Sequence, residues 1–462
     1  RLGDLPFVYE TDGWAKLHIR TVDNCRSLTF KRLRFPQDVM GFRELVDGSR
    51  ISDAPISVNF DMRVESESSG NEAILFTDIS ESPGHSAVMN ILTRQRLCEA
   101  FDVEPGELID ILSWAMENPS EPILVEGEKA PVLDNTMVEP NLLEIPIPWH
   151  YKEDGGRYQS ASIIIAQYGG IRNTSFHRQL VKGKDSTCVR LVPRHLRTMV
   201  NNALEANEEV SIAVVNGPDP VVLLAAAMSF DEPLDELRVA AALHERLYGT
   251  KLEVIELSNG VTVPAISEYA MEARITTSTG EEGPYVDITG TVDDIRLEPI
   301  IEYDAIHHRD NPIFHALIPA GVEHMTLMGM PRAPTIKTAV SEVVSCTDVF
   351  LTDGGSGWLS SVVQIIPEEK GDGMKAIKAA LDGHKSMKQV IVVDKDIDVS
   401  NSSRVEWALM TRWQPDKDTL ILSNQKGSSL DPSRSSDGTT SKIGMDATID
   451  PGIDRSPYES VL

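Results

Sequence analysis

The chain has 462 residues, of which 41% are apolar, so it is long enough for two or three globular domains. It carries 43 Lys and Arg against 71 Asp and Glu, a formal net charge of −28, which repels phosphate backbones and disfavours nucleic acid as a partner. The four cysteines are widely spaced and form no CxxC pair, which argues against a disulfide framework. No apolar run approaches the ~20 residues of a bilayer span, and no secretory signal is visible, so the sequence argues against membrane insertion and predicts a cytoplasmic protein.

The first part of the chain predicts a small α/β segment. Residues 1–39 show little periodicity, and Met40 begins a stretch typical of a protein start, so residues 1–39 are either an extension or an ordinary pair of strands. Residues 119–148 are rich in proline and acid and predict a linker. We expect one strand and then two helices, at 73–76, 86–102 and 105–116.

From about residue 160 the chain becomes rich in β-branched residues. Strands are expected at 161–167, 188–192, 210–215, 251–257 and 288–292. Helices are expected at 193–206, 218–227 and 234–247. Strands and helices that alternate without a regular βαβ period favour an α+β domain built on a barrel or a split sheet.

The last third of the chain predicts a separate α/β domain. Strands are expected at 349–351, 389–393 and 419–422. Helices are expected at 335–345, 371–381 and 405–410. The tail from Ser423 is rich in Gly, Ser, Asp and Pro, a composition typical of loops.

Two short clusters, at 172–178 and 190–197, gather positive and ligand-forming side chains in this acidic chain. They hold an asparagine, two histidines and five arginines, which suggests a bound anion, a metal ion or both. Guanidinium groups bind phosphate in bidentate fashion, so four of these arginines are candidates for a phosphate clamp: Arg178, Arg190, Arg194 and Arg197. The equal alternative is that they pair with some of the many acids.

A divalent metal has candidate ligands in and near these clusters. Asn173 and His195 each offer a neutral donor atom, and Glu236 opens a predicted helix and can add a carboxylate. Such a set of oxygen and nitrogen ligands suits Mn or Mg better than Zn. The alternative is that these three residues are ordinary surface or capping residues.

Two carboxylates flank a predicted turn further along the chain. Gly283 and Pro284 can place Glu282 near Asp287. Two close carboxylates cannot both ionise freely, so one can be held protonated as a general acid. The alternative is a solvated acidic turn.

Taken in order, these blocks resemble the UbiD family of decarboxylases, which use prenylated FMN. The match runs from about Met40 to Tyr458, nearly the whole chain. Its main carriers are RNTSFHR at 172–178, VRLVPRHL at 189–196, LDE at 234–236, EGPYVDITG at 282–290 and KIGMDAT at 442–448.

The resemblance implies a mixed α+β and α/β fold in three parts. An N-terminal α/β segment at 40–117 precedes a split β-barrel like that of flavin reductases at 118–299, which binds prenylated FMN. A C-terminal α/β domain at 300–462, with the loop-rich tail, drives oligomerisation. The resemblance therefore also implies a homo-oligomer, a dimer or a hexamer, and a flavin prenyltransferase that supplies the cofactor.

The resemblance implies a metal ion, usually Mn²⁺, on Asn173, His195 and Glu236 that bridges to the flavin phosphate, often with a K⁺ ion beside Thr174 and residues 226–228. It implies a catalytic set of Arg178, Glu282 and Asp287, with Val286 where many members have Gly. The residues implied to contact the cofactor are Thr174, Ser175, Phe176, His177, Arg178, Arg190, Leu191, Val192, Arg194, His195, Leu196, Ala227, Met228 and Glu236.

Loss of CO2 from an sp2 carbon leaves a carbanion that no side chain can stabilise, so the cofactor must act as the electron sink. The resemblance implies that Asp287 returns the proton. Three segments, at 171–178, 189–196 and 327–332, are similar to an archaeal branch that includes enzymes converting trans-anhydromevalonate 5-phosphate to isopentenyl phosphate. The phosphate of this substrate needs cationic partners, for which Arg332 and His324 are candidates; the equal alternative is that both residues are structural. An aromatic acid such as 3-polyprenyl-4-hydroxybenzoate is the alternative substrate, and a flavin-binding protein without activity is the alternative of another class.

Overall fold

The computed structural model describes residues 41–228, 230 and 233–458, and the backbone of three strands within residues 1–40. These strands, β1 (Phe7–Thr11), β2 (Trp14–His18) and β3 (Ser27–Thr29), form an antiparallel sheet. Residues 1–40 and 41–462 are two compact units. The remainder of the 1–39 segment lies outside the described residues, and its status as an extension stays a prediction.

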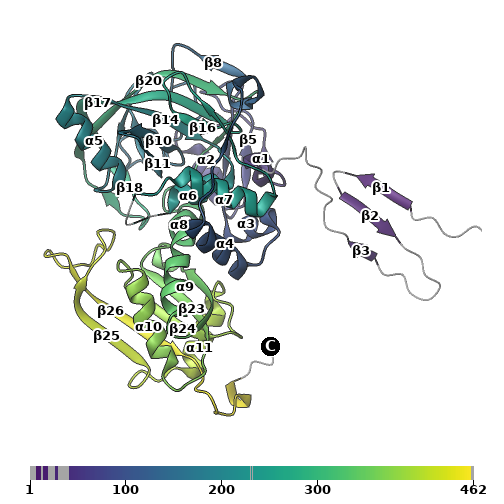
Figure 1. Ribbon diagram of the computed structural model, residues 1–462, viewed down its shortest axis with the longest axis vertical. Coiled ribbons are helices and arrows are strands. Elements are labelled where there is room, and N and C mark those ends of the chain that lie inside the picture. Colours follow the sequence, from purple (N-terminus) through teal and green to yellow (C-terminus); the bar gives the residue numbers. More distant parts are fainter. Residues whose placement is uncertain are drawn as a thin grey trace, which may run out of the picture. The chain divides into compact units, whose positions relative to one another are not determined.

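The second unit begins with a small sheet covered by helices (Figure 1). The strand order is β21-β6-β5-β4, and β21 reaches this sheet from far along the chain. The strands are β4 (Arg50–Ser52), β5 (Ile74–Phe76), β6 (Ser86–Met89) and β21 (Ile313–His315). The helices are α1 (Phe42–Val46), α2 (Asp61–Ser68), α3 (Arg94–Phe101) and α4 (Pro105–Glu117).

The helix predicted at 86–102 is wrong over its first residues. Residues 86–89 are strand β6, because they find hydrogen-bonding partners on both sides, antiparallel in β5 and parallel in β21. Helix α3 begins only after Thr93, whose side chain accepts the N–H of Arg96 at 3.2 Å. The helix predicted at 105–116 is confirmed as α4, which starts with Pro105 in its first turn.

The central part is a curled antiparallel sheet of nine strands (Figure 1). Its order is β11-β10-β14-β17-β20-β13-β12-β9, with β8 paired to β20. The strands are β8 (Asn135–Met137), β9 (Tyr158–Gln159), β10 (Ile163–Tyr168), β11 (Ile171–Phe176), β12 (Gln179–Val181), β13 (Ser186–Val189), β14 (Val210–Asn216), β17 (Tyr269–Glu282) and β20 (Arg296–His308). Helix α5 (His195–Ala206) buries Leu196, Met199 and Val200 in the core of this sheet.

Two further helices pack beside β11: α6 (Pro220–Ala227) and α7 (Glu236–Tyr248). Every residue of α6 but the last is buried. A small sheet, β16-β15-β7, is made of β7 (Ile123–Leu124), β15 (Glu253–Glu256) and β16 (Thr262–Pro264). The strand predicted at 288–292 is wrong: this stretch is mostly a turn between β18 (Tyr285–Val286) and β19 (Val292–Asp293).

The C-terminal part is an α/β layer of five strands in the order β22-β23-β24-β26-β25. The strands are β22 (Ser345–Leu351), β23 (Ser360–Ile366), β24 (Gln389–Asp394), β25 (Thr419–Lys426) and β26 (Thr439–Ala447). The helices are α8 (Val322–Gly329), α9 (Ala333–Ser341), α10 (Asp372–Gly383) and α11 (Ser402–Arg412). Helices α9 and α10 cover one face of the sheet and α11 covers the other, so the sheet is buried on both faces.

The prediction of loop from Ser423 onward is wrong over 423–426, which continue β25, and over 439–447, which form β26. β26 is an inner strand that pairs parallel with β24 and antiparallel with β25. Short 3-10 helices complete the described chain at Gly127–Lys129, Pro131–Leu133, Met330–Arg332, Asp353–Gly355 and Ser456–Tyr458. Among the described helices, none has the length and apolar character that a bilayer span requires. The predicted mixed α+β and α/β fold class is confirmed.

Candidate active site

Arg178 lies between β11 and β12 and is the centre of a cluster of carboxylates. Its Nε and Nη2 atoms donate to the two oxygens of Glu282 at 2.8 and 2.9 Å. Its Nη1 donates to Oδ2 of Asp287 at 2.9 Å, and Nη2 also donates to Oδ2 of Asp293 at 2.8 Å. The structure thus brings together the predicted residues Arg178, Glu282 and Asp287, and adds Asp293, which sequence reasoning missed.

A tight hairpin after β17 positions the carboxylates of Asp287 and Asp293. Strand β17 ends at Glu282, and the next residue, Gly283, has φ +102 and lies where a Cβ would come within 2.8 Å of the Asp294 carbonyl oxygen, so only glycine fits. Strands β18 and β19 then pair, with Tyr285 opposite Asp293. This pairing explains why Asp293 faces the same arginine as Asp287.

Tyr158 of β9 fixes Glu282 from the other side. Its hydroxyl donates to Oε1 of Glu282 at 3.1 Å and accepts the N–H of Gly283 at 3.2 Å. The Glu282 side chain is 0% exposed, so Arg178 and Tyr158 supply the charge and hydrogen bonds that its burial requires. Tyr158 was also missed from sequence, because its strand lies more than a hundred residues before Glu282.

Further titratable groups surround Arg178. Its guanidinium lies 4.5 Å from the centre of the Tyr285 ring. Asp154 accepts the N–H of Val286 at 2.8 Å, and burial raises the pKa of the Asp154 carboxyl to about 6. His324 of α8 interacts electrostatically with Asp287 and Arg178, and burial lowers the pKa of this histidine.

Asn173 and Glu236, two of the three predicted metal ligands, are in direct contact. Glu236 is the first residue of α7, and its carboxylate lies 2.9 Å from Nδ2 of Asn173 and accepts the N–H of Thr174 at 2.7 Å. Asp235 caps this helix and pairs with Arg172 of β11 at 2.6 Å, which holds the helix end against the strand. His195 begins α5, which also packs on β11, but no hydrogen bond joins it to either residue within the described part of the chain.

Glu236 is a buried carboxylate without a cationic partner among residues 41–228, 230 and 233–458. Burial raises the pKa of the Glu236 carboxyl to about 8, which reflects the missing counter-charge. The Thr174 hydroxyl beside it is buried and has no hydrogen-bond partner in the same described part. A cation held by oxygen ligands would supply what both groups lack.

The hydrogen-bond chain behind Asn173 also fits a cation. Ser175 Oγ lies 2.8 Å from Oδ1 of Asn173 and 2.9 Å from Nε2 of His177, whose Nδ1 lies 3.1 Å from the carbonyl oxygen of Arg190. That carbonyl can only accept, and burial lowers the pKa of His177 to about 4, so a neutral His177 donates from Nδ1 and accepts at Nε2. Ser175 has one hydroxyl hydrogen and two acceptors within reach, Asn173 Oδ1 and His177 Nε2, so it links these two side chains.

The Asn173 amide lies between Glu236 and Ser175: Nδ2 donates to Oε1 of Glu236, and Oδ1 accepts from Ser175 Oγ. The two ends of an amide have nearly the same shape, so rotation of this side chain by half a turn would point Oδ1 toward the Glu236 carboxylate. An amide oxygen and a buried carboxylate are ligands for hard divalent cations, so the residues present fit a divalent metal ion.

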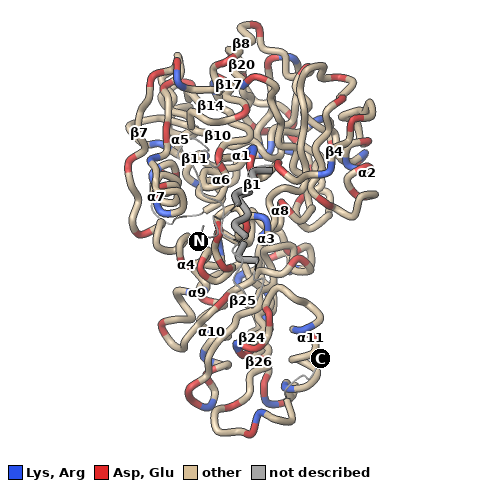
Figure 2. The backbone as a smooth tube through the Cα atoms, turned by 90° about the vertical axis from the view of Figure 1, so that its right-hand side faces the viewer, with Lys and Arg blue, Asp and Glu red and all other residues tan. Residues whose placement is uncertain are grey.

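Most of the predicted phosphate-clamp arginines have carboxylate partners. Arg190 and Arg197 both bind Glu298, which is buried on β20, and Arg178 binds the three carboxylates described above. Acidic residues are spread over both the central and the C-terminal parts (Figure 2). The phosphate clamp stays a prediction, and the structure shows pairing with acids for these three arginines.

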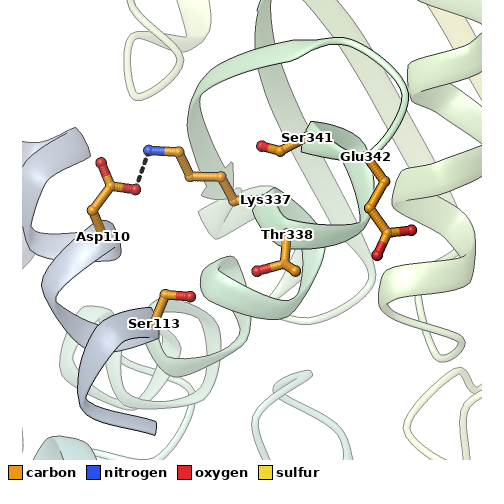
Figure 3. Close-up of a pocket in the computed structure, with 6 residues that line it drawn as sticks. All are labelled: Asp110, Ser113, Lys337, Thr338, Ser341 and Glu342. Carbon is orange, nitrogen blue, oxygen red and sulfur yellow. Dashed lines mark ion pairs between the residues drawn. The ribbon is translucent and has the colours of Figure 1, made fainter. Parts of the chain in front are cut away.

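The remaining predicted cofactor contacts differ in what they can offer. The side chains of Leu191 and Leu196 are in the barrel core, so only their backbone is available to a ligand. Val192 is exposed, Phe176 and Ala227 are half-buried and Met228 is buried. A separate cavity of about 320 Å³ lies between α4 and α9 (Figure 3), and none of the predicted site residues lines it.

Comparison with known proteins identifies the family. Residues 123–322 match the family model described as 3-octaprenyl-4-hydroxybenzoate carboxy-lyase Rift-related domain, and residues 325–447 match the C-terminal domain of the same carboxy-lyase. Anhydromevalonate phosphate decarboxylases from Methanosarcina mazei and Methanocaldococcus jannaschii are both 41% identical, over 85% and 80% of this chain and 91% and 88% of their own length.

The chain is also similar to proteins of lower sequence identity. A gallate decarboxylase from Lactiplantibacillus plantarum is 25% identical over 82% of this chain and 84% of its own. Among solved structures, the UbiD-class enzyme HmfF from Pelotomaculum thermopropionicum in complex with FMN is 31% identical, with a TM-score of 0.85 over 91% of this chain and 97% of that one. An evolved dimeric form of HmfF in complex with prFMN is 30% identical, with a TM-score of 0.81 over 90% of this chain and 96% of that one. The chain therefore belongs to the UbiD family of carboxy-lyases.

Proposed function

We propose that this protein is a decarboxylase that uses prenylated FMN to convert trans-anhydromevalonate 5-phosphate to isopentenyl phosphate and CO2. The 41% identity to two archaeal anhydromevalonate phosphate decarboxylases over most of the chain supports the substrate. The cofactor is supported by the likeness to HmfF, whose structures hold FMN and prFMN. The single observation that carries the chemistry is Arg178, which holds Glu282 and Asp287 side by side.

The two carboxylates suit different roles. Glu282 is fully buried and Arg178 donates to both of its oxygens, so its role is to orient Arg178. Asp287 accepts from Arg178 at Oδ2 and from the N–H of Ile288 at Oδ1, and its side chain is 26% exposed. Asp287 is therefore the carboxyl that can carry a proton to the substrate carbon after CO2 leaves. The prenylated flavin, when bound, supplies the electron sink that this step needs.

Asn173, His195 and Glu236 would hold a divalent metal ion, which we propose to be Mn²⁺. Its support is the buried Glu236 carboxyl, which has no cationic partner among the described residues, and the Asn173 amide in direct contact with it. The metal would neutralise Glu236 and bind the flavin phosphate. A K⁺ ion beside Thr174 is the accompanying proposal, supported by the buried hydroxyl of that residue, which has no hydrogen-bond partner among the described residues.

The proposal also covers assembly, cofactor supply and the domain division. We expect a cytoplasmic homo-oligomer, a dimer or a hexamer, that receives its flavin from a prenyltransferase. Light scattering on the purified protein measures the assembly. Limited proteolysis tests the proposed boundaries near residues 40 and 118, where cleavage should come early. The proposed boundary at 300 falls within β20, which is paired on both sides, so we expect cleavage near it only beyond the ends of this strand.

Two other functions remain as outcomes of the test. One is decarboxylation of an aromatic acid such as 3-polyprenyl-4-hydroxybenzoate, and the other is flavin binding without catalysis. The grouping of Arg178, Glu282 and Asp287 favours an enzyme over a binding protein, because it holds a partly exposed carboxyl beside a buried ion pair, as a positioned proton donor requires.

The experiment uses protein co-expressed with a flavin prenyltransferase and supplied with Mn²⁺. We expect CO2 release from trans-anhydromevalonate 5-phosphate and none from 4-hydroxybenzoates. Turnover of the 4-hydroxybenzoates alone would support the aromatic alternative. A coloured protein that is inert on every acid would support the binding protein.

Asp287→Asn tests the proposed proton donor, and Asp304→Asn is its matched control. Asp304 also pairs with an arginine, Arg274, but on the exposed side of the barrel.

A further inference from the structure

Asp293 is a third carboxylate on Arg178, and it carries its own arginine. Its Oδ2 accepts from Arg178 Nη2 at 2.8 Å and from Arg296 Nη1 at 2.7 Å, and its Oδ1 accepts from Arg296 Nη2 at 2.7 Å. Burial opposes ionisation of Asp293, but hydrogen bonds from Arg296 and Arg178 outweigh it and hold the pKa of this carboxyl at about 2. Asp293 is thus a permanent negative charge next to the catalytic cluster.

The hairpin that carries Asp293 does not need this side chain to close. Its strands pair through the backbone, Tyr285 opposite Asp293 and Val286 opposite Val292. The turn between them is fastened by Gly290, whose N–H donates to the carbonyl oxygen of Asp287 at 2.8 Å. Besides accepting the N–H of Asp294 at 3.0 Å, the Asp293 side chain shares the Arg178 guanidinium with Asp287.

We propose that Asp293 and Arg296 are positioning residues that divide the Arg178 charge between two carboxylates and so set how readily Asp287 takes up its proton. This inference rests on the proposed role of Asp287 as proton donor. Without Asp293, Arg178 would favour the anion of Asp287 more strongly, and the proton needed for catalysis would be lost at lower pH. Without Arg296, Asp293 would be less neutralised and would favour the protonated form of Asp287.

The charges that face Asp287 come from every element around it. Arg178 precedes β12, Glu282 ends β17, Asp293 lies on β19 and Arg296 begins β20. Tyr285, Asp154 and His324 of α8 complete the surroundings. Of these groups, Asp293 and Arg296 form an opposite pair outside the proposed catalytic set, so removing each one should act on Asp287 with opposite sign.

The test compares Asp293→Asn, Arg296→Gln and the double variant as holoenzymes loaded with prenylated FMN and Mn²⁺. The alkaline limb of kcat/KM against pH reports loss of the essential acid in the free enzyme. We expect the limb to move down by about half a pH unit or more in Asp293→Asn and up by a similar amount in Arg296→Gln, because both charges are partly screened by solvent. The double variant should return close to the wild type.

A merely structural role would lower activity in both variants without opposite shifts of the limb, and shifts of the same sign or no shifts overturn the proposal. If Asp293→Asn does not fold, Arg296→Gln alone must still move the limb upward. A second readout needs no turnover: the ¹³C carboxyl resonance of Asp287 in aspartate-labelled protein, assigned by its loss in Asp287→Asn. Opposite shifts of its titration in a protein that releases no CO2 would uphold this inference and refute the proposed function.

Discussion

Replacing Arg178 with lysine keeps the charge but removes the geometry that the site depends on. Arg178 spreads four hydrogen bonds over Glu282, Asp287 and Asp293 from three nitrogen atoms. A lysine ammonium places all its donors on one nitrogen, so it cannot hold both Glu282 oxygens and also reach Asp287. Arg178→Lys should therefore leave at least one carboxylate without its partner.

The magnitude follows from the contacts that are lost. A hydrogen bond to a charged group contributes about 1.5–3 kcal/mol, and at least two of the four should disappear. Asp287 and Asp293 are 26% and 24% exposed, so water replaces part of the loss at these two. We expect the free energy of unfolding to fall by about 2–3 kcal/mol. We expect kcat/KM to fall about 10²- to 10³-fold, because the proton donor is no longer positioned.

Arg274→Lys is the matched control. Arg274 also pairs with three carboxylates, Glu209, Glu302 and Asp304, but its side chain is 35% exposed. Exposed ion pairs contribute less than about 1 kcal/mol, so this variant should lose little stability and no activity. Urea unfolding and steady-state kinetics measure both quantities. Equal, small effects of Arg178→Lys and Arg274→Lys would refute the view that Arg178 organises the site.

Three other changes have defined outcomes. Burial raises the pKa of the Asp219 carboxyl to about 7, so the folded state binds this proton more tightly than the unfolded chain does, and the free energy of unfolding declines between pH ~4 and ~7. Asp219→Asn should remove that decline. In urea unfolding, this variant should be more stable than the wild type by ~2 kcal/mol at pH 8, but not at pH 4. Ser175→Ala should weaken Mn²⁺ binding about 10-fold in calorimetry, because it breaks the chain that orients the metal-binding amide, and Ser175→Thr should restore it. Gly373→Ala places a Cβ 2.0 Å from an Asp446 oxygen and should lower the free energy of unfolding by about 2–3 kcal/mol, measured by thermal unfolding. Gly354→Ala should lower it little, because a Cβ at that position has no described atom within 4 Å. The first fails if the pH dependence is unchanged, the second if alanine and threonine bind Mn²⁺ alike, and the third if the two glycine variants are equally stable.

The fold class could be predicted because many helices and strands carry their own pattern. Helix α4 begins with Pro105 and buries one apolar stripe, and β24 is a run of buried β-branched residues, so both are visible in a short stretch of sequence. Strands β17 and β20 were missed, because their exposed ends are polar and only their long mutual pairing makes them strands. β26 was missed for a similar reason: its central place depends on β24, about fifty residues earlier.

The site was predictable where it is local in sequence and hidden where it depends on register. Glu282 and Asp287 flank one turn, so their proximity follows from Gly283 and Pro284. The contact of Asp293 with Arg178 depends on which residues of β18 and β19 face each other. Asp293 lies three positions before Arg296, and a turn that contains Gly290 separates it from Tyr285. This spacing was the only signal in the sequence that could have pointed to Asp293.

Decarboxylation by Asp287 is tested by CO2 release from trans-anhydromevalonate 5-phosphate, with the protein loaded with prenylated FMN and Mn²⁺ and with Asp287→Asn and Asp304→Asn in parallel. We expect sustained release by the wild type and by Asp304→Asn, and a loss of about 10²-fold or more in Asp287→Asn, as for removal of a general acid. No release by the loaded wild type, or full activity in Asp287→Asn, would show that Asp287 is not the proton donor of such a decarboxylase.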